Sequence, residues 1–94
     1  MTDTAPDGSA LQVTLKLYAS LSDHLPPEAR QTRRWPLTVP AGSTVADVIA
    51  RQNLPPKLCH LVLVNGVFVA PPERASHLLR DQDELAIWPP VAGG

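Results

Sequence analysis

The chain has 94 residues and a formal net charge of −1, with 44% hydrophobic and 18% charged residues, which predicts one globular domain and leaves no room for a second. A domain of this size buries about 60–65% of the surface of its unfolded chain, so it has little volume for a deep catalytic cleft, and we expect it not to be an enzyme. The near-neutral charge and scattered arginines lack the basic stripe that nucleic-acid binding requires, which argues against such a partner.

Residues 1–10 are polar and contain Asp, Thr, Ser, Gly and Pro, a composition typical of a disordered extension. They lack the apolar core of a signal peptide, and no apolar run in the chain approaches the ~20 residues needed to span a bilayer. The single cysteine, Cys59, agrees with a reducing compartment. We therefore expect a cytoplasmic protein without a membrane partner.

Apolar and polar residues alternate over residues 11–17, which predicts a strand with one buried face. Residues 19–33 contain prolines and polar residues, and we expect a loop there with some helix. Alternation resumes over residues 34–39. Pro36 within this second strand favours an edge position, because proline donates no hydrogen bond to a ladder.

Apolar residues at helical spacing follow Thr44, which predicts a helix that begins with Thr44 as its cap. Asp47, three residues later, lies favourably near the positive end of this helix. The helix should end near Asn53, because Pro55 cannot continue it.

The apolar runs 61–64 and 67–69 flank Asn65-Gly66, and such a pair is a strong hairpin signal because both residues tolerate positive φ. Alternation over residues 85–87 predicts a final strand. The order is therefore strand, strand, helix, short strands, last strand. It predicts an α+β, ubiquitin-like β-grasp fold, in which a mixed sheet of four to five strands packs on one main helix.

The chain ends in the string Asp83-Glu84-Leu85-Ala86-Ile87-Trp88-Pro89-Pro90-Val91-Ala92-Gly93-Gly94. This string closely resembles the "DEVAxxPPVxGG" ending of the MoaD/ThiS family of sulfur carriers, and in particular its molybdopterin-synthase small-subunit branch. The resemblance covers nearly everything after Ala10, and its upstream parts are Leu17-Tyr18-Ala19, the stretch from Gly42 to Asp47, and Val64-Asn65-Gly66. It implies a β-grasp domain over residues 11–88 and a flexible Gly-Gly tail over residues 89–94.

One departure lies in the turn before the last strand, where the family usually has glycine and this chain has Gln82. The turn then needs either another geometry or a left-handed Gln82, which costs about 1 kcal/mol or more for a residue with a side chain.

The resemblance implies that an E1-like adenylyltransferase uses ATP to adenylate the Gly94 carboxylate, which is then converted to a thiocarboxylate. The leading sulfur acceptor is a molybdopterin precursor held by the large subunit of molybdopterin synthase. The chain is then a carrier and a substrate, and it binds no cofactor itself. Three alternatives stay open: a carrier for thiamin, a tungsten-type pterin or another thio-product; a ubiquitin-like modifier joined through Gly94 to lysines; and an interaction module whose tail has no chemistry.

The tail has a composition suited to entering a partner's active site. Pro89-Pro90 favours an extended backbone, and a six-residue tail that continues through Val91-Ala92 reaches roughly 20 Å at ~3.3 Å per residue. Gly93 and Gly94 have no side chains, so they can pass through a narrow channel and let the partner approach the reacting carbonyl.

By the same resemblance, Tyr18, Phe68 and Trp88 form a partner-facing patch, with ordinary sheet packing as the alternative for each. Trp in particular is enriched at interfaces because its apolar body gives a large contact area.

We predict no metal site and no catalytic thiol. The three histidines and Cys59 show neither metal-ligand spacing nor a nucleophile–base pair, and we interpret Cys59 as a buried hydrophobe. Asp81, Asp83 and Glu84 are interpreted as a solvated turn.

Overall fold

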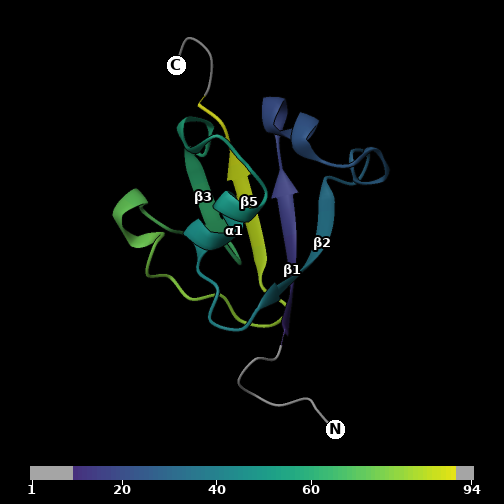
Figure 1. Cartoon of the computed structure of the whole chain (residues 1–94). Helices are drawn as coiled ribbons and strands as arrows, with labels where there is room; N and C mark the ends of the chain where they lie inside the picture. Colours follow the sequence, from purple (N-terminus) through teal and green to yellow (C-terminus); the bar gives the residue numbers. More distant parts are fainter. Residues whose placement is uncertain (1–9, 91–94) are drawn as a thin grey trace, which may run out of the picture.

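A computed structural model describes residues 10–90 of the chain (Figure 1). Five strands form one mixed sheet in the order β2-β1-β5-β3-β4, and one α-helix packs on it. The elements are β1 (Ala10–Leu17), β2 (Arg34–Pro40), α1 (Val45–Arg51), β3 (Leu61–Val64), β4 (Val67–Phe68) and β5 (Glu84–Trp88). Short 3-10 helices connect them: η1 (Ala19–His24), η2 (Pro27–Ala29), η3 (Pro56–Leu58) and η4 (Pro71–Glu73). The architecture confirms the predicted sheet of four to five strands on one main helix.

The last strand occupies the middle of the sheet. β5 pairs in parallel with β1 and antiparallel with β3, while β1–β2 and β3–β4 are antiparallel hairpins. In Figure 1 the arrows of β1 and β5 therefore point the same way, toward the end of the sheet where η1 lies. The predicted edge position of Pro36 is confirmed, because β2 is an outer strand. β1 begins one residue earlier than expected, since Ala10 pairs with Pro40.

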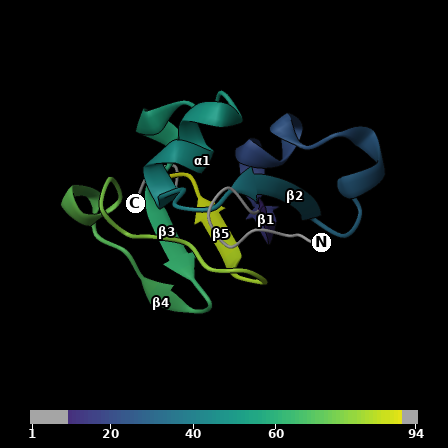
Figure 2. The same cartoon turned by 60° about the horizontal axis from the view of Figure 1, so that its bottom comes forward.

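The predicted helix is confirmed together with its start signal. Thr44 Oγ1 accepts a hydrogen bond from the Asp47 N–H (3.1 Å), and Asp47 Oδ2 accepts one from the Thr44 N–H (2.9 Å), which completes a capping box. Figure 2 shows α1 lying across one face of the sheet. Its buried residues Val48 and Ile49 face the inner side chains of the strands. Within residues 10–90, no helix has the length and apolar character needed to cross a membrane.

The core lies between α1 and the sheet and extends under the 3-10 turns. Its fully buried large side chains are Val13, Leu15, Leu17, Leu21, Leu25, Val39, Val45, Val48, Val62, Val69, Leu85 and Ile87. Seven of these twelve lie on strands, and those of β1 alternate with outward-facing residues, as the periodic pattern predicted.

The turn before β5 uses the left-handed geometry. Gln82 has a φ of 71°, its N–H donates to the Gln12 carbonyl (2.6 Å), and the Gln12 N–H donates to Asp81 Oδ1 (2.8 Å). The turn is thereby attached to β1, which leaves Gln82 no freedom to adopt an ordinary φ. The left-handed alternative stated for this residue is confirmed.

We expect Gln82→Gly to raise the free energy of unfolding by about 0.5–1 kcal/mol. Glycine removes the energetic penalty of the left-handed conformation. It also increases the conformational entropy of the unfolded chain, but this loss is smaller than the penalty that it removes. Urea denaturation measures the change. Gln52→Gly is a matched control, since Gln52 has a φ of −91° and gains nothing from glycine. An equal effect at both positions would contradict the strain at Gln82.

The acidic turn is not solvated throughout, and for Asp83 that interpretation was wrong. Asp83 is 8% exposed. Its Oδ1 accepts from Asn65 Nδ2 and its Oδ2 from the Arg80 N–H, both at 2.8 Å. The side-chain oxygen of Asn65 accepts the N–H of Glu84 (2.9 Å). A buried carboxylate needs such donors, so the Asn65 turn and the start of β5 hold each other in place.

Candidate functional site

We call the sheet face opposite α1 the open face (Figure 2). Successive side chains of a strand point to opposite sides, so residues that alternate with the buried ones belong to this face. From the β2 edge to the β4 edge they are Arg34, Pro36, Thr38, Gln12, Thr14, Lys16, Tyr18, Glu84, Ala86, Trp88, Leu61, Leu63 and Phe68. All except Ala86 are exposed or half-buried.

Two of the three predicted patch residues are in direct contact. The rings of Tyr18 and Trp88 stack with centroids 4.1 Å apart and an interplanar angle of 1°. Tyr18 follows β1 and its N–H donates to the Ile87 carbonyl (3.2 Å), while the Trp88 carbonyl accepts from the His60 N–H (3.0 Å). The parallel register of β1 and β5 thus brings the rings together, and such a pair contributes about 0.5–1.5 kcal/mol beyond its buried area.

Phe68 lies on the same face but away from the stack. It sits on the outer strand β4 opposite Leu63, and its side chain is 53% exposed. Leu63 and Leu61 of β3 lie between it and Trp88. Sequence reasoning missed these two leucines, because a continuous apolar run such as 61–64 does not show which residues point outward.

The predicted tail begins where β5 ends. Pro89 is buried and Pro90 is exposed. The other predicted tail residues, Val91, Ala92, Gly93 and Gly94, lie outside the described residues, so their roles stay predictions.

Charged groups gather beside the stack, on the β1–β2 side of the open face. Lys16 Nζ lies 5.8 Å and Arg33 Cζ 6.0 Å from the centroid of the Tyr18 ring, within cation–π range. Glu84 forms ion pairs with Arg34 (2.8 Å) and Lys16 (3.8 Å). Sequence reasoning did not find this cluster, because its members come from three separate segments.

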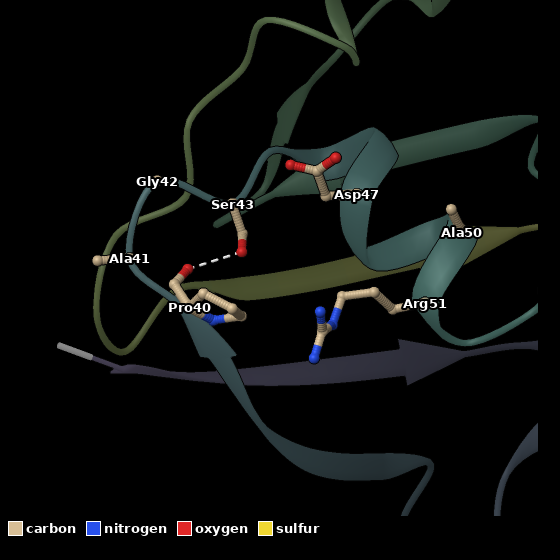
Figure 3. Close-up of a pocket in the computed structure, with 7 residues that line it drawn as sticks. All are labelled: Pro40, Ala41, Gly42, Ser43, Asp47, Ala50 and Arg51. Carbon is tan, nitrogen blue, oxygen red and sulfur yellow. Dashed lines mark hydrogen bonds between the residues drawn. The ribbon is translucent and has the colours of Figure 1, made fainter. Parts of the chain in front are cut away.

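A cavity of about 370 Å³ lies away from the open face, between the β2–α1 turn and α1 (Figure 3). Its polar groups serve the fold: the Ser43 hydroxyl donates to the Pro40 carbonyl (2.6 Å), and Asp47 belongs to the capping box. Arg51 lines the same space from the last turn of α1. This cavity has no nucleophile–base pair, and residues 10–90 contain no cluster of three metal-ligating side chains.

Cys59 is buried, as expected for a structural cysteine, with 3% of its surface exposed. Burial raises the pKa of the Cys59 thiol above its ordinary value, and the positive charge of Arg74 opposes this in part. Arg74 also donates to the Cys59 carbonyl (2.6 Å) and the His60 carbonyl (3.0 Å).

We expect iodoacetamide to modify Cys59 in the folded chain at least about ten times more slowly than in denaturant, because the protonated, buried thiol is a poor nucleophile. Because folding raises the pKa of the Cys59 thiol, the unfolded chain loses this proton at a lower pH than the folded chain does. The free energy of unfolding therefore falls as the pH rises above the ordinary thiol pKa. The rate of mass gain measures the reactivity, with Cys59→Ala as the blank. Equal rates in both states would contradict the burial.

Comparisons with known proteins agree with the β-grasp fold described above. The model of a family described as the ThiS family matches residues 27–94. No curated protein sequence matches the chain. The structure is similar to the solution structure of the Haloferax volcanii HVO 2177 protein, with a TM-score of 0.70 at 24% identity over 99% of this chain and 94% of that one, a likeness that concerns the fold alone.

Two further structures are those of small archaeal modifier protein 1 (SAMP1). The Haloferax volcanii crystal structure has a TM-score of 0.61 at 26% identity, over 88% of this chain and 99% of that one. The Methanosarcina acetivorans solution structure has a TM-score of 0.61 at 27% identity, over 93% of this chain and all of that one (100%).

Proposed function

The chain belongs to the ThiS family of ubiquitin-like β-grasp proteins, and from this premise we propose that it carries sulfur as a thiocarboxylate on Gly94. The observation that carries the proposal is the match of the family model through the Gly-Gly end of the chain, together with the central position of β5 in the sheet. The chain is then the substrate of an activating enzyme and performs no catalysis itself.

The position of β5 supports this function. Pro89 is the last buried residue of the described range 10–90, and the Tyr18–Trp88 stack holds the strand end just before it. The five residues from Pro90 to Gly94 reach about 17 Å when extended, at ~3.3 Å each. A partner that binds the open face beside Trp88 can therefore receive the carboxylate in an active site of ordinary depth.

The proposed chemistry needs a partner because a carboxylate is a poor acyl donor. An oxygen of the Gly94 carboxylate attacks the α-phosphate of ATP in an E1-like adenylyltransferase, and pyrophosphate leaves. Hydrosulfide released by a sulfur donor then displaces AMP from the acyl adenylate and loses its proton, and the resulting thiocarboxylate carries the sulfur to an acceptor.

For the acceptor we propose a molybdopterin precursor held in the large subunit of molybdopterin synthase. The Pro-Pro-Val-Ala-Gly-Gly ending supports this branch of the family. A thiamin, tungsten-pterin or other thio-product pathway uses the same carrier chemistry. Identification of the enzyme that co-purifies with the chain distinguishes these acceptor pathways.

The decisive test is the intact mass of the chain after incubation with the E1-like enzyme of its own genome, ATP and a sulfur donor. We expect a mass gain equal to the exchange of one oxygen for one sulfur at the C-terminus. No such gain with the cognate enzyme would refute the carrier function.

A second candidate, a protein modifier, is favoured by the similarity to the two SAMP1 structures, whose names describe modifier proteins. In this function the activated Gly94 carbonyl forms an isopeptide bond with a lysine of a target. Tryptic digestion of the producing cells should then yield peptides with a Gly-Gly remnant on lysine that depend on this chain, and their absence argues against conjugation.

A further inference from the structure

The open face has two halves of different chemistry, and the half formed by β3 and β4 is apolar. Leu61 and Phe68 are 37% and 53% exposed, and Leu63 is the ladder neighbour of Phe68. Leu61 is also the ladder neighbour of Trp88, so the apolar surface continues to the aromatic stack. Single exposed apolar residues are ordinary, but a contiguous group of this kind marks an interaction surface.

The half formed by β1 and β2 is positive, although the whole chain carries a net charge of −1. We call Lys16, Arg33 and Arg34 the cationic flank. Glu84 pairs with two of them, while Arg33 has no ion pair within residues 10–90 and its guanidinium lies over the Tyr18 ring. Three cations against one carboxylate leave an excess of positive charge directly beside the stack.

We propose that the open face fits a partner protein whose docking surface is apolar on one half and acidic on the other, with the carboxylates placed against Arg33. The inference rests on the proposed function, because it states the chemistry of the surface with which the activating enzyme receives this chain. Complementary charge at the edge of an interface speeds association and fixes the orientation of the two proteins. Here it aligns the end of β5 with the entrance of the active site.

A second copy of this chain does not fit the open face as well. In a symmetric dimer through this face, one cationic flank would lie near the other or over the partner's apolar half. The first arrangement places like charges together and the second buries an unpaired charge, and both are unfavourable. An acidic partner surface avoids both costs.

The test compares two charge reversals of equal size, Arg33→Glu and Arg51→Glu. Arg51 is exposed at the end of α1, away from the open face, so its reversal changes the net charge without changing the cationic flank. Binding to the E1-like enzyme of the same genome is measured by biolayer interferometry at several salt concentrations. We expect Arg33→Glu to weaken binding about five- to ten-fold, mainly through slower association, with a weaker salt dependence than the unchanged chain.

The Arg51→Glu chain should bind as the unchanged chain does, and Arg33→Lys, which keeps the charge, should restore most of the affinity. Equal binding of the two reversals would overturn the inference while the carrier function stands, provided that the unchanged chain still gains sulfur. If the unchanged chain is not activated at all, the proposed function fails and the inference with it. A dimer that Trp88→Ala disrupts would also overturn it, because the open face would then hold a second copy.

Discussion

We expect a chain that ends at Gly93 to gain no sulfur from the E1-like enzyme, ATP and a sulfur donor under conditions that load the full chain completely. The buried Pro89 anchors the start of the tail, so removing one residue withdraws the carboxylate by about 3.3–3.6 Å. Reacting groups must lie within about 3–3.5 Å of each other, and a misplacement of 1 Å already costs about 100-fold in rate. Intact mass measures the loaded fraction.

Two further variants distinguish the effect of tail length from the effect of the terminal residues. Deletion of Ala92 keeps Gly93-Gly94 but shortens the tail equally, and we expect the same loss. Ala92→Ser keeps both length and ending and should be loaded normally. Full loading of the chain that ends at Gly93 would contradict the role of Gly94 as the reacting residue.

The second large effect is expected in the core. Ile87 is fully buried (0% exposed) on the central strand β5, between Leu17 of β1 and Val62 of β3. Neighbours on both sides are held by strand pairing and cannot close the space left by a smaller side chain. Ile87→Ala should therefore lower the free energy of unfolding by about 2–5 kcal/mol, which is a large part of the ~5–15 kcal/mol of a typical domain.

Thermal and urea unfolding measure this loss, and the melting temperature should fall by about 10 °C or more for a domain of this size. Ile87→Val removes one methyl group at the same position and should cost only about 0.5–1.5 kcal/mol. Similar small losses in both variants would show that Ile87 is not held as tightly as its burial indicates. Below the melting temperature, Ile87→Ala should still accept sulfur, because its side chain points away from the open face.

Several features of this chain depend only on residues that are close together in the sequence. The helix over Val45–Arg51 follows from signals within a few residues of its start, and so do the Asn65-Gly66 turn and the strand over residues 11–17. The Gly-Gly ending is likewise a local signal, and it led to the family that the comparisons support. Each of these features depends on neighbours along the chain, which is why alternation, capping and turn residues were sufficient to predict it.

Other features depend on residues far apart in the sequence. Asp83 was expected to be solvated, but it is buried and accepts a hydrogen bond from the side chain of Asn65, 18 positions earlier. The outward leucines of β3 became recognisable only once the pairing with β5 set their register.

The chain's own order of residues was thus enough to establish the β-grasp architecture, the capped helix and the family, because strand alternation, helix caps and the terminal motif act over short distances. The two-sided chemistry of the open face was not accessible in this way. Tyr18, Arg33 and Trp88 belong to separate segments, and only the insertion of β5 between β1 and β3 brings the stacked rings together and sets the cationic flank beside them. Long-range strand pairing therefore decides which surface accompanies the tail, since it determines which distant side chains share one face.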